Sequence, residues 1–533
     1  MIRLPLVGTT LFVLLVFAIG PAQADEPLSI AQLRADREAA AQRERRIIFN
    51  NDGNEPVYLC QDTTPNELLR HRTSPLVNTH VDTIFYCTWS SGFGMFTHDT
   101  KVGNVFKTKE GLFSKNSIEK MLDAGTDPLQ VMADFGKQND IEIFWSFRMN
   151  DTHDAGLSGY GPIMLRANPL KLEHPEWLIG TPKKRPKFGG WSAVDFTRPE
   201  IRDLAVGYVE EVCQNYDING IELDFFRHPV FFKRAAQTGT PCNEEERILM
   251  TDMIRRIRKV TEVEGQKRGT PILLSVRVPD SVPYCRDCGL DIEKWMQDDL
   301  IDLMTVSGYF RLSPWEDSVK LGNKYNVPVY PSLDESRVRD PEAKKLRMTV
   351  EAYRGRALAA RSAGMAGLNL FNSFNPHAPI WKELGEPATL ARQDHDYFAS
   401  IRGVGAAAGG ALPHRSYQKI ATLNPKAAVA VSADKAATVS FYNGVEYQKL
   451  DSATPPQITL RLQFDKEAPQ NIQVALNGVA LKSSTAADGW LECTVDPGML
   501  KLNENQVTVS LGDKDAAAKW TDLRCTVRWN HDK

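Results

Sequence analysis

The chain has 533 residues, of which 42% are hydrophobic and 25% are charged, with 64 lysines and arginines against 67 aspartates and glutamates. This mixture is typical of a globular protein and excludes a disordered or fibrous one. The formal net charge of −3 provides neither the basic surface that nucleic acid requires nor a polybasic anchor for anionic lipid, so we expect no nucleic-acid partner.

The first segment has the features of a secretory signal. Arg3 precedes an apolar run over residues 4–20, and Ala22-Gln23-Ala24 forms an A-x-A cleavage pattern. We predict a signal peptide over residues 1–24 and a mature protein that is secreted or periplasmic, with no membrane span. An uncleaved anchor is the alternative, although the apolar run is short for a bilayer span.

A helix-compatible segment over residues 25–45 comes next, and over residues 46–405 short β-branched and aromatic runs alternate with longer helical stretches. The connections are far longer than hairpin loops, so eight strands alternating with helices predict an α/β fold, a (β/α)8 TIM barrel. A doubly wound open sheet is the alternative, but no glycine-rich phosphate loop follows an early strand. The predicted strands are 46–51, 83–89, 141–147, 220–226, 272–278, 303–309, 327–332 and 366–372.

Two helices can be placed in more detail. Thr197 and Glu200 have the spacing of a capping box, and Pro199 falls in the first turn, so a helix is predicted up to about Asn215. A second helix is predicted over residues 127–137, directly before the third strand.

The composition changes after residue 405. Beyond a glycine- and alanine-rich stretch over 405–411, apolar residues alternate strictly, as in the run 458–464, and Asn477-Gly478 is a turn signal. Short alternating strands predict an antiparallel β-sandwich over residues 406–533.

Export would make the eight cysteines candidates for disulfides. Cys493 and Cys525 lie in two strand-like runs and are candidates to bridge there. Cys285 and Cys288 have a C-x-x-C spacing without a second pair, which favours a loop disulfide or free thiols over a metal site.

In a barrel, chemistry gathers where the strands end at the C-terminal face. In the fourth strand Glu222 and Asp224 alternate with apolar residues, so both carboxylates are expected to point into the barrel. Two buried carboxylates side by side raise the pKa of one of them, which suits a general acid. Ion pairing that only supports the barrel is the alternative for both residues.

Glycoside hydrolysis needs a second carboxylate across the site. Glu335, after the seventh strand, is the first choice, with Asp334 and Asp280 also available, and a solvated loop glutamate is the alternative. Several cations near the strand ends could position a substrate, set carboxylate pKa values or recognise an acidic glycan. They are Arg148, Arg227, His228 and Arg277.

Aromatic side chains crowd the same strand ends, and sugar rings stack their apolar faces on such groups. Trp89 is the best single candidate for a platform, and Tyr309 is another. Polar side chains that could orient a sugar are Asn50, Asp52, His153 and Asn372.

The stretch YDINGIELDFFRHP over residues 216–229, with RIIFNNDGNE at the first strand and FWSFRMNDTHD at the third, resembles the bacterial glycosyl-hydrolase-like family ten proteins. The likeness covers roughly residues 45–400 and implies an exported, carbohydrate-active (β/α)8 barrel. Asp224 matches the acidic residue that ends a DG-x-x-x-D type strand in a wider group of barrel glycosidases. The C-terminal segment is similar to jelly-roll-like sandwiches that accompany many glycosidases.

Other enzyme classes lack their motifs, since neither a histidine pair at zinc spacing nor a serine-hydrolase elbow nor a phosphate loop occurs. We therefore expect a glycoside hydrolase acting on a poly- or oligosaccharide without metal or cofactor. Asp224 and Glu335 are its expected catalytic carboxylates, with Glu222 tuning or substituting for Asp224. A non-catalytic saccharide-binding barrel is the alternative.

Overall fold

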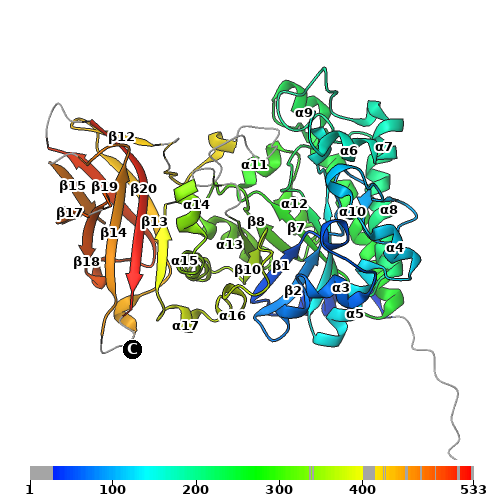
Figure 1. The fold of residues 1–533 in the computed structure, drawn as a ribbon, viewed down its shortest axis with the longest axis horizontal. Coiled ribbons are helices and arrows are strands. Elements are labelled where there is room, and N and C mark those ends of the chain that lie inside the picture. Colours follow the sequence, from blue (N-terminus) through cyan, green and yellow to red (C-terminus); the bar gives the residue numbers. More distant parts are fainter. Residues whose placement is uncertain are drawn as a thin grey trace, which may run out of the picture.

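A computed structural model describes residues 28–334, 338, 341–399, 414–423, 425, 428–450, 454–468, 471–486, 488–512 and 517–529. The predicted signal peptide, the stretch 405–411 and Glu335 lie outside these residues. Figure 1 shows two parts side by side, a barrel surrounded by helices and a stack of antiparallel strands drawn in orange and red.

Eight parallel strands form a closed barrel in the order β1-β10-β9-β8-β7-β6-β5-β2. Every strand predicted from the sequence is present, so the predicted (β/α)8 barrel is confirmed. The strands are β1 (Ile47–Asn51), β2 (Val81–Tyr86), β5 (Glu142–Arg148), β6 (Gly220–Asp224), β7 (Leu273–Val278), β8 (Leu303–Val306), β9 (Val329–Leu333) and β10 (Leu368–Leu370). A small parallel pair, β3 (Met95–Phe96) and β4 (Asn104–Val105), lies in the connection from β2 to β5.

Helices cover the outside of the barrel because the outward faces of its strands are apolar. Ile221 and Leu223 of β6 share one hydrophobic core with Val209 and Val212 of α8. In the described ranges, no helix is both long and apolar enough to cross a bilayer. The helices are α1 (Ile30–Ala41), α2 (Glu55–Tyr58), α3 (Pro65–Arg70), α4 (Ile118–Asp123), α5 (Pro128–Asn139), α6 (Gly161–Arg166), α7 (Pro169–Glu173), α8 (Pro199–Asn215), α9 (Lys233–Thr238), α10 (Glu244–Arg268), α11 (Val282–Asp287), α12 (Ile292–Gln297), α13 (Trp315–Lys324), α14 (Pro341–Arg347), α15 (Val350–Ser362), α16 (Ile380–Glu383) and α17 (Pro387–Leu390).

The start of α8 differs from the prediction in one respect. Pro199 is the first helical residue, where its missing amide hydrogen costs no helical bond. The predicted capping box is wrong, because the N-cap is Arg198 and no side chain caps the helix. Thr197 Oγ1 donates instead to Asp195 Oδ2 at 2.6 Å, a nearer acceptor within its own turn.

The interior of the barrel changes from apolar to polar along its axis. Near the N-terminal ends of the strands, Phe144, Leu273 and Leu303 belong to one buried apolar cluster, with a single buried ion pair, Arg45 and Glu142, beside it. Toward the C-terminal ends, several charged side chains are buried together, among them Asp224 and Arg277. Burying charged groups is costly unless they pair, so this polar end is where a functional site is expected.

The C-terminal part consists of two antiparallel sheets, as the sequence predicted. One sheet has the order β11-β20-β14-β18-β17, with β12 also paired to β20, and the other has the order β13-β19-β15-β16. Along β14 the buried residues alternate with more exposed ones, and Asn477 and Gly478 form the predicted turn between β15 and β16 with φ of 52° and 87°. The strands are β11 (His395–Phe398), β12 (Val429–Ser432), β13 (Ala437–Asn443), β14 (Gln457–Phe464), β15 (Ile472–Leu476), β16 (Val479–Leu481), β17 (Ser483–Thr485), β18 (Leu491–Val495), β19 (Asn503–Leu511) and β20 (Ala517–Arg528).

The eight cysteines are all free and buried. Cys493 on β18 and Cys525 on β20 both lie opposite Leu460, which is on the strand between them. Two strand spacings separate their backbones by about 10 Å, beyond the reach of a disulfide. The candidate bridge between Cys493 and Cys525 is therefore wrong.

Helices α14 and α15 lie between the barrel and the sandwich (Figure 1). Arg347 of α14 donates from Nη2 to Asp522 Oδ1 of β20 at 2.8 Å, and both side chains are buried. The strand β11 follows the barrel in the chain but pairs with β20 of the sandwich. The two parts are thus joined both by a buried ion pair and by a shared strand.

Candidate active site at the C-terminal face of the barrel

Backbone strain is concentrated at the C-terminal face of the barrel. Residues other than Gly, Asn and Asp adopt a backbone conformation with positive φ at a cost of about 1–2 kcal/mol each. In the described ranges the non-glycine residues of this kind are Thr88, Trp89, Ser90, Phe93 and Ser307, and all of them follow β2 or β8. Strain of this kind gathers at functional sites, where surrounding contacts hold it in place. This face is therefore the candidate active site.

The strained connection after β2 holds the side chain and backbone of Arg148. Arg148 Nη1 donates to the carbonyl oxygen of Trp89 at 3.3 Å and to Ser91 Oγ at 3.2 Å. The amide of Arg148 donates to Ser90 Oγ at 3.0 Å. The strained connection thus places hydrogen-bond acceptors around the buried guanidinium group and the amide of Arg148.

Asp52 is the carboxylate that Arg148 binds most closely, through a hydrogen bond from Nη2 to Oδ1. Burial alone would raise the pKa of Asp52, but the guanidinium groups of Arg148 and Arg227 outweigh it, so the pKa lies below its ordinary value. Asp52 is therefore ionised at neutral pH, and 12% of its side chain remains exposed to solvent.

Asp151 is a fully buried carboxylate that the sequence analysis missed. Its Oδ1 lies 2.7 Å from Nδ1 of His153, and its Oδ2 lies 3.6 Å from Arg148 Nη1 and 4.0 Å from Nδ1 of His228. Burial would raise the pKa of Asp151, but these neighbours, His153 first, hold it well below its ordinary value. The sequence did contain a signal for Asp151, because this acidic residue comes shortly after β5, at the same face of the barrel where Asp224 ends β6.

Asp151, His153 and His228 place one ligand atom each within 4.8 Å of one another, so we asked whether they suit a metal ion. Nε2 of His153 lies 3.1 Å from the guanidinium Nη2 of Arg227, which donates to it, and Nδ1 of His228 accepts from the amide of Thr152 at 3.2 Å. The ring lone pairs are thus engaged, and a guanidinium charge is adjacent. The arrangement suits a hydrogen-bond network better than a metal site.

Asp224 lies in the same region with its two oxygens in different surroundings. Oδ1 accepts from the amides of Phe226 at 2.9 Å and Arg227 at 3.0 Å, and Oδ2 accepts from Arg277 Nη1 at 3.1 Å. A carboxylate offers about two acceptor sites on each oxygen. Oδ1 is therefore saturated, whereas Oδ2 keeps one acceptor site that no residue in the described ranges fills. Asp224 is 2% exposed, and Arg277 is fully buried.

Glu222 lies two residues below Asp224 on β6 and is fully buried. Its Oε2 accepts a hydrogen bond from Ser146 Oγ, and its Oε1 has no hydrogen-bond partner in the part of the chain that the structure describes. Burial, followed by the negative charge of Asp224, raises the pKa of Glu222 to about 8. Glu222 is therefore protonated at neutral pH, beside an aspartate that Arg277 pairs.

Aromatic rings cover the two other arginines of the site. The guanidinium carbon of Arg277 lies 3.7 Å from the ring centroid of Phe371, and that of Arg227 lies 5.4 Å from the centroid of Tyr309. Arg277 is also paired with Asp224, as Arg148 is with Asp52. The charges of Arg277 and Arg148 are thus balanced by carboxylates inside the protein.

Trp89 lies in a different environment from the one predicted. Its ring stacks on Phe106 with centroids 5.2 Å apart, meets Phe113 edge-on, and is 6% exposed. The ring belongs to an apolar cluster beneath the connecting segments, and this burial leaves little of its surface for a sugar, so the platform role stays a prediction. Tyr160, with 41% of its surface exposed and its ring 6.3 Å from that of His153, is an aromatic side chain that solvent does reach.

The remaining predicted residues occupy several places. Asn50 of β1 points into the barrel, buried, with no partner in the described ranges for Oδ1. Asn372, which follows β10 with a φ of 56°, donates from Nδ2 to Asp334 Oδ2 at 3.3 Å. Asn372 and Asp334 thus belong to the C-terminal face, whereas Glu335 is outside the described residues.

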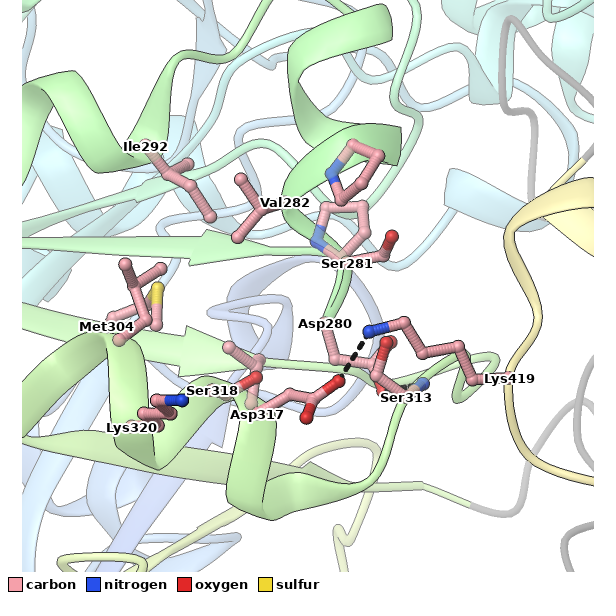
Figure 2. A pocket seen from close by; sticks show the side chains of 14 residues that line it. Asp280, Ser281, Val282, Ile292, Met304, Ser313, Asp317, Ser318, Lys320 and Lys419 are labelled. Carbon is pink, nitrogen blue, oxygen red and sulfur yellow. Dashed lines mark hydrogen bonds and ion pairs between the residues drawn. The ribbon is translucent and has the colours of Figure 1, made fainter.

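Asp280 lines a separate cavity of about 190 Å³ beside this face (Figure 2). Both of its oxygens accept from the amide of Leu312 at 3.0 Å, and Oδ2 also accepts from that of Ser313 at 3.1 Å. Burial raises the pKa of Asp280. An ion pair of 2.6 Å between Asp317 and Lys419 crosses the cavity in Figure 2. Asp280 therefore fixes the connection after β8 rather than facing the aspartates of the candidate site.

No protein-family model matches the chain, and no curated protein matches its sequence. Among solved structures, the chain is similar to the glycoside hydrolase domain of PgaB (BpsB) from Bordetella bronchiseptica, at 10% identity and a TM-score of 0.40 over 64% of this chain and 98% of that one. It is also similar to a Paenibacillus cycloisomaltooligosaccharide glucanotransferase, at 9% identity and a TM-score of 0.36 over 91% of this chain and 57% of that one, so it spans little more than half of that enzyme's length. A bacterial fucosidase is similar at 9% identity and a TM-score of 0.34, over 90% and 95% of the two chains. These similarities concern the fold.

Proposed function

We propose that the protein is a glycoside hydrolase whose active site is the C-terminal face of the barrel. The observation that supports this most is the pair of carboxyl groups on β6, Asp224 held by Arg277 and Glu222 with its pKa raised to about 8. A raised pKa keeps a carboxyl group protonated at neutral pH, which suits a general acid. Active sites of (β/α)8 barrels lie at this face.

In this proposal Asp224 is the carboxylate that acts on the sugar. Arg277 and two backbone amides orient it, and the remaining acceptor site of Oδ2 is the one that would face the anomeric carbon or a water molecule. Glu335, one residue after Asp334 at the end of β9, is the proposed second carboxyl group. Asp52 and Arg148 act as positioning residues.

A non-catalytic saccharide-binding barrel is the second candidate, and one observation favours it. Asp52, Asp151 and Asp224 are each hydrogen-bonded to arginine or histidine and are at most 9% exposed. Such a closed network suits recognition of hydroxyl groups by a rigid surface.

The experiment that separates the two candidates is turnover of a panel of aryl glycosides and neutral oligosaccharides by the wild type, D224A, D224N and E335Q. We expect D224A to lose at least about 1,000-fold in kcat/KM, by analogy with other residues that stabilise the reacting atoms, and added azide to restore product formation if Asp224 is a nucleophile. Saccharide binding by every protein without turnover by any would support the binding barrel.

A matched control is D302N. Asp302 is also a buried aspartate in an ion pair, 2.7 Å from Arg258, but it precedes β8 at the opposite end of the barrel. This variant should lose stability without a change in kcat/KM. If D302N and D224N impair turnover equally, the effect of the Asp224 substitution is structural and the hydrolase proposal loses its support.

A further inference from the structure

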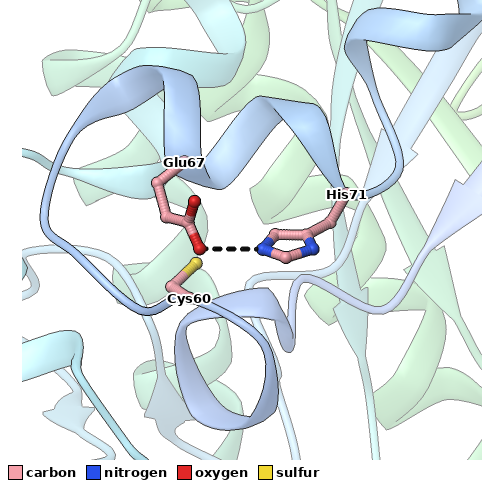
Figure 3. A group of neighbouring side chains, drawn as sticks. All are labelled: Cys60, Glu67 and His71. Carbon is pink, nitrogen blue, oxygen red and sulfur yellow. Dashed lines mark hydrogen bonds and ion pairs between the residues drawn. The ribbon is translucent and has the colours of Figure 1, made fainter.

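A second cluster of reactive side chains lies on the connection after β1, apart from the candidate active site. Glu67 and His71 are four residues apart on one face of α3 and its C-cap, and Cys60 lies in the turn before that helix (Figure 3). One ligand atom of each lies within 4.8 Å of the other two, and Glu67 Oε1 is 3.1 Å from His71 Nε2.

The local sequence holds these three side chains in place. Thr64 caps α3 by accepting from the amide of Glu67 at 3.2 Å. The Glu67 carboxylate reaches back to accept from the amide of Gln61 at 2.8 Å, directly after Cys60 in the chain. Cys60 and Glu67 are each 6% exposed, and 15% of the His71 side chain is exposed. The cluster is thus pre-organised and partly shielded, with one edge open to solvent.

The surroundings of the thiol are acidic. Burial, followed by the charges of Glu55 and Glu67, raises the pKa of Cys60 to about 12. Glu55 is 1% exposed, and its Oε2 has no hydrogen-bond partner among the described residues. Arg70 forms a two-bond ion pair with Glu67, from Nε to Oε2 and from Nη2 to Oε1 at 2.9 Å, and its side chain is 54% exposed.

We propose that Cys60, Glu67 and His71 bind a divalent metal ion of the zinc type. Thiolate, imidazole and carboxylate are the three protein ligands that zinc takes, and tetrahedral coordination places ligand atoms about 3.3–3.8 Å apart. Here Glu67 Oε1 and His71 Nε2 are 3.1 Å apart and the Cys60 sulfur lies within 4.8 Å of both, so small side-chain movements would complete the geometry. Water supplies the fourth ligand. The thiol proton passes to solvent when the sulfur coordinates the metal, and Arg70, being exposed, swings away from Glu67.

This cluster differs from Asp151, His153 and His228 in its guanidinium neighbour. The Arg70 side chain beside Glu67 is 54% exposed and can move into solvent, whereas the Arg227 side chain, which donates to His153, is only 9% exposed. A bound ion would tie the turn at Cys60 to α3, in the connection that begins with Asp52 at the active-site face. The inference does not depend on the proposed hydrolase function.

The test uses the full-length protein, stripped with EDTA and titrated with Zn²⁺ and Co²⁺. We expect about one zinc per chain to remain after dialysis, a rise of several degrees in the unfolding midpoint, and a near-ultraviolet thiolate-to-cobalt absorption band. The variants C60S and H71A should each weaken binding at least 100-fold, and C60S should abolish the band. Near-ultraviolet circular dichroism of the metal-free variants checks that they fold.

Two matched controls locate the ion. C213S removes another buried cysteine, one that lies on α8 and outside this cluster, and should leave binding unchanged. H153A disrupts the cluster at the barrel face and should also leave binding unchanged. The proposal would be overturned if C60S and H71A still bound one zinc per chain, or if H153A were the only variant that lost zinc. It would also be overturned if the wild type bound no zinc at micromolar concentration.

Discussion

At the scale of single residues, Glu222 combines complete burial with an oxygen that has no hydrogen-bond partner among the described residues. Its folded-state pKa of about 8 lies above the ordinary value of 4.5. Between these two values the unfolded chain releases a proton that the folded protein keeps, so the unfolded state binds fewer protons and stability falls as pH rises.

The variant E222Q should remove this pH dependence. Glutamine resembles the protonated acid and cannot ionise, so above about pH 5 the variant should become progressively more stable than the wild type. Between the two pKa values, the difference in the free energy of unfolding should grow by up to about 1.4 kcal/mol for each pH unit. Urea unfolding of both proteins at pH 5, 6, 7 and 8 measures the difference. Parallel curves would show that Glu222 is ionised in the folded protein.

At Ser307 no side-chain hydrogen bond within the described ranges offsets the backbone strain. It has a φ of 66°, is 1% exposed, and its hydroxyl has no hydrogen-bond partner in the described ranges. Glycine accepts this conformation without a steric penalty, although it gains more freedom in the unfolded chain. S307G should therefore stabilise the protein by about 1 kcal/mol, measured by urea unfolding.

Ser275 provides the matched control for that substitution. It is also a buried serine whose hydroxyl has no partner in the described ranges, but it lies in the extended strand β7. S275G should destabilise the protein, because glycine weakens a strand interior. Equal effects at both serines would point to the hydroxyl group, rather than the backbone, as the cause.

At the scale of elements, α15 meets the sandwich through a glycine. A Cβ atom on Gly355 would lie 2.0 Å from the carbonyl oxygen of Asp396 in β11, so only glycine permits this approach of helix and strand. Helix propensity alone favours alanine over glycine by about 1 kcal/mol. At Gly355 packing outweighs propensity, and G355A should destabilise the protein by several kcal/mol, on the scale of other overpacked sites.

Gly207 in α8 provides the contrast. A Cβ atom there would lie 3.3 Å from Val102 Cγ1, and Val102 is 44% exposed and free to shift. G207A should therefore be neutral or stabilising by up to about 1 kcal/mol. Thermal unfolding of both variants tests the pair, and a stable G355A would show that α15 does not pack tightly on β11.

At the scale of the whole molecule, the sequence predicts export, and we propose that the leader is removed after Ala24. In a bacterial host that exports the protein, Edman sequencing of the exported chain should begin at Asp25. A24R should block cleavage, because the residue before the cut must be small, and the protein should keep its leader. An exported wild-type chain that begins at Met1 would contradict the signal-peptide prediction.

The barrel and the sandwich are joined through α14, α15 and β11, so the molecule is not a pair of independent units on a loose linker. Arg347 and Asp522 form a buried ion pair across this junction. Breaking one partner of a buried pair costs about 3–5 kcal/mol, which gives the sandwich a stabilising role irrespective of any ligand.

The architecture and its elements were predictable from the sequence because they depend on local patterns. Short β-branched and aromatic runs marked the eight barrel strands, alternation of apolar residues at period two marked the long strands of the sandwich, and Asn477-Gly478 marked its turn. The inward direction of Glu222 and Asp224 followed from the same alternation. The eight barrel strands alternating with helices then left a closed barrel as the way to bury both faces of the sheet.

Only the tertiary structure decided which side chains meet. Asp151 lies beside both His153 and His228 because two connections meet at one face of the barrel. Trp89 is buried because Phe106 and Phe113 pack against it. Cys493 and Cys525 are separated by the strand β14 that lies between them. Local periodicity determines which face a residue occupies, but not its neighbour across the barrel. That neighbour is set by strand register, by the paths of long connections and by the balance of buried charge, all of which join residues far apart in the chain.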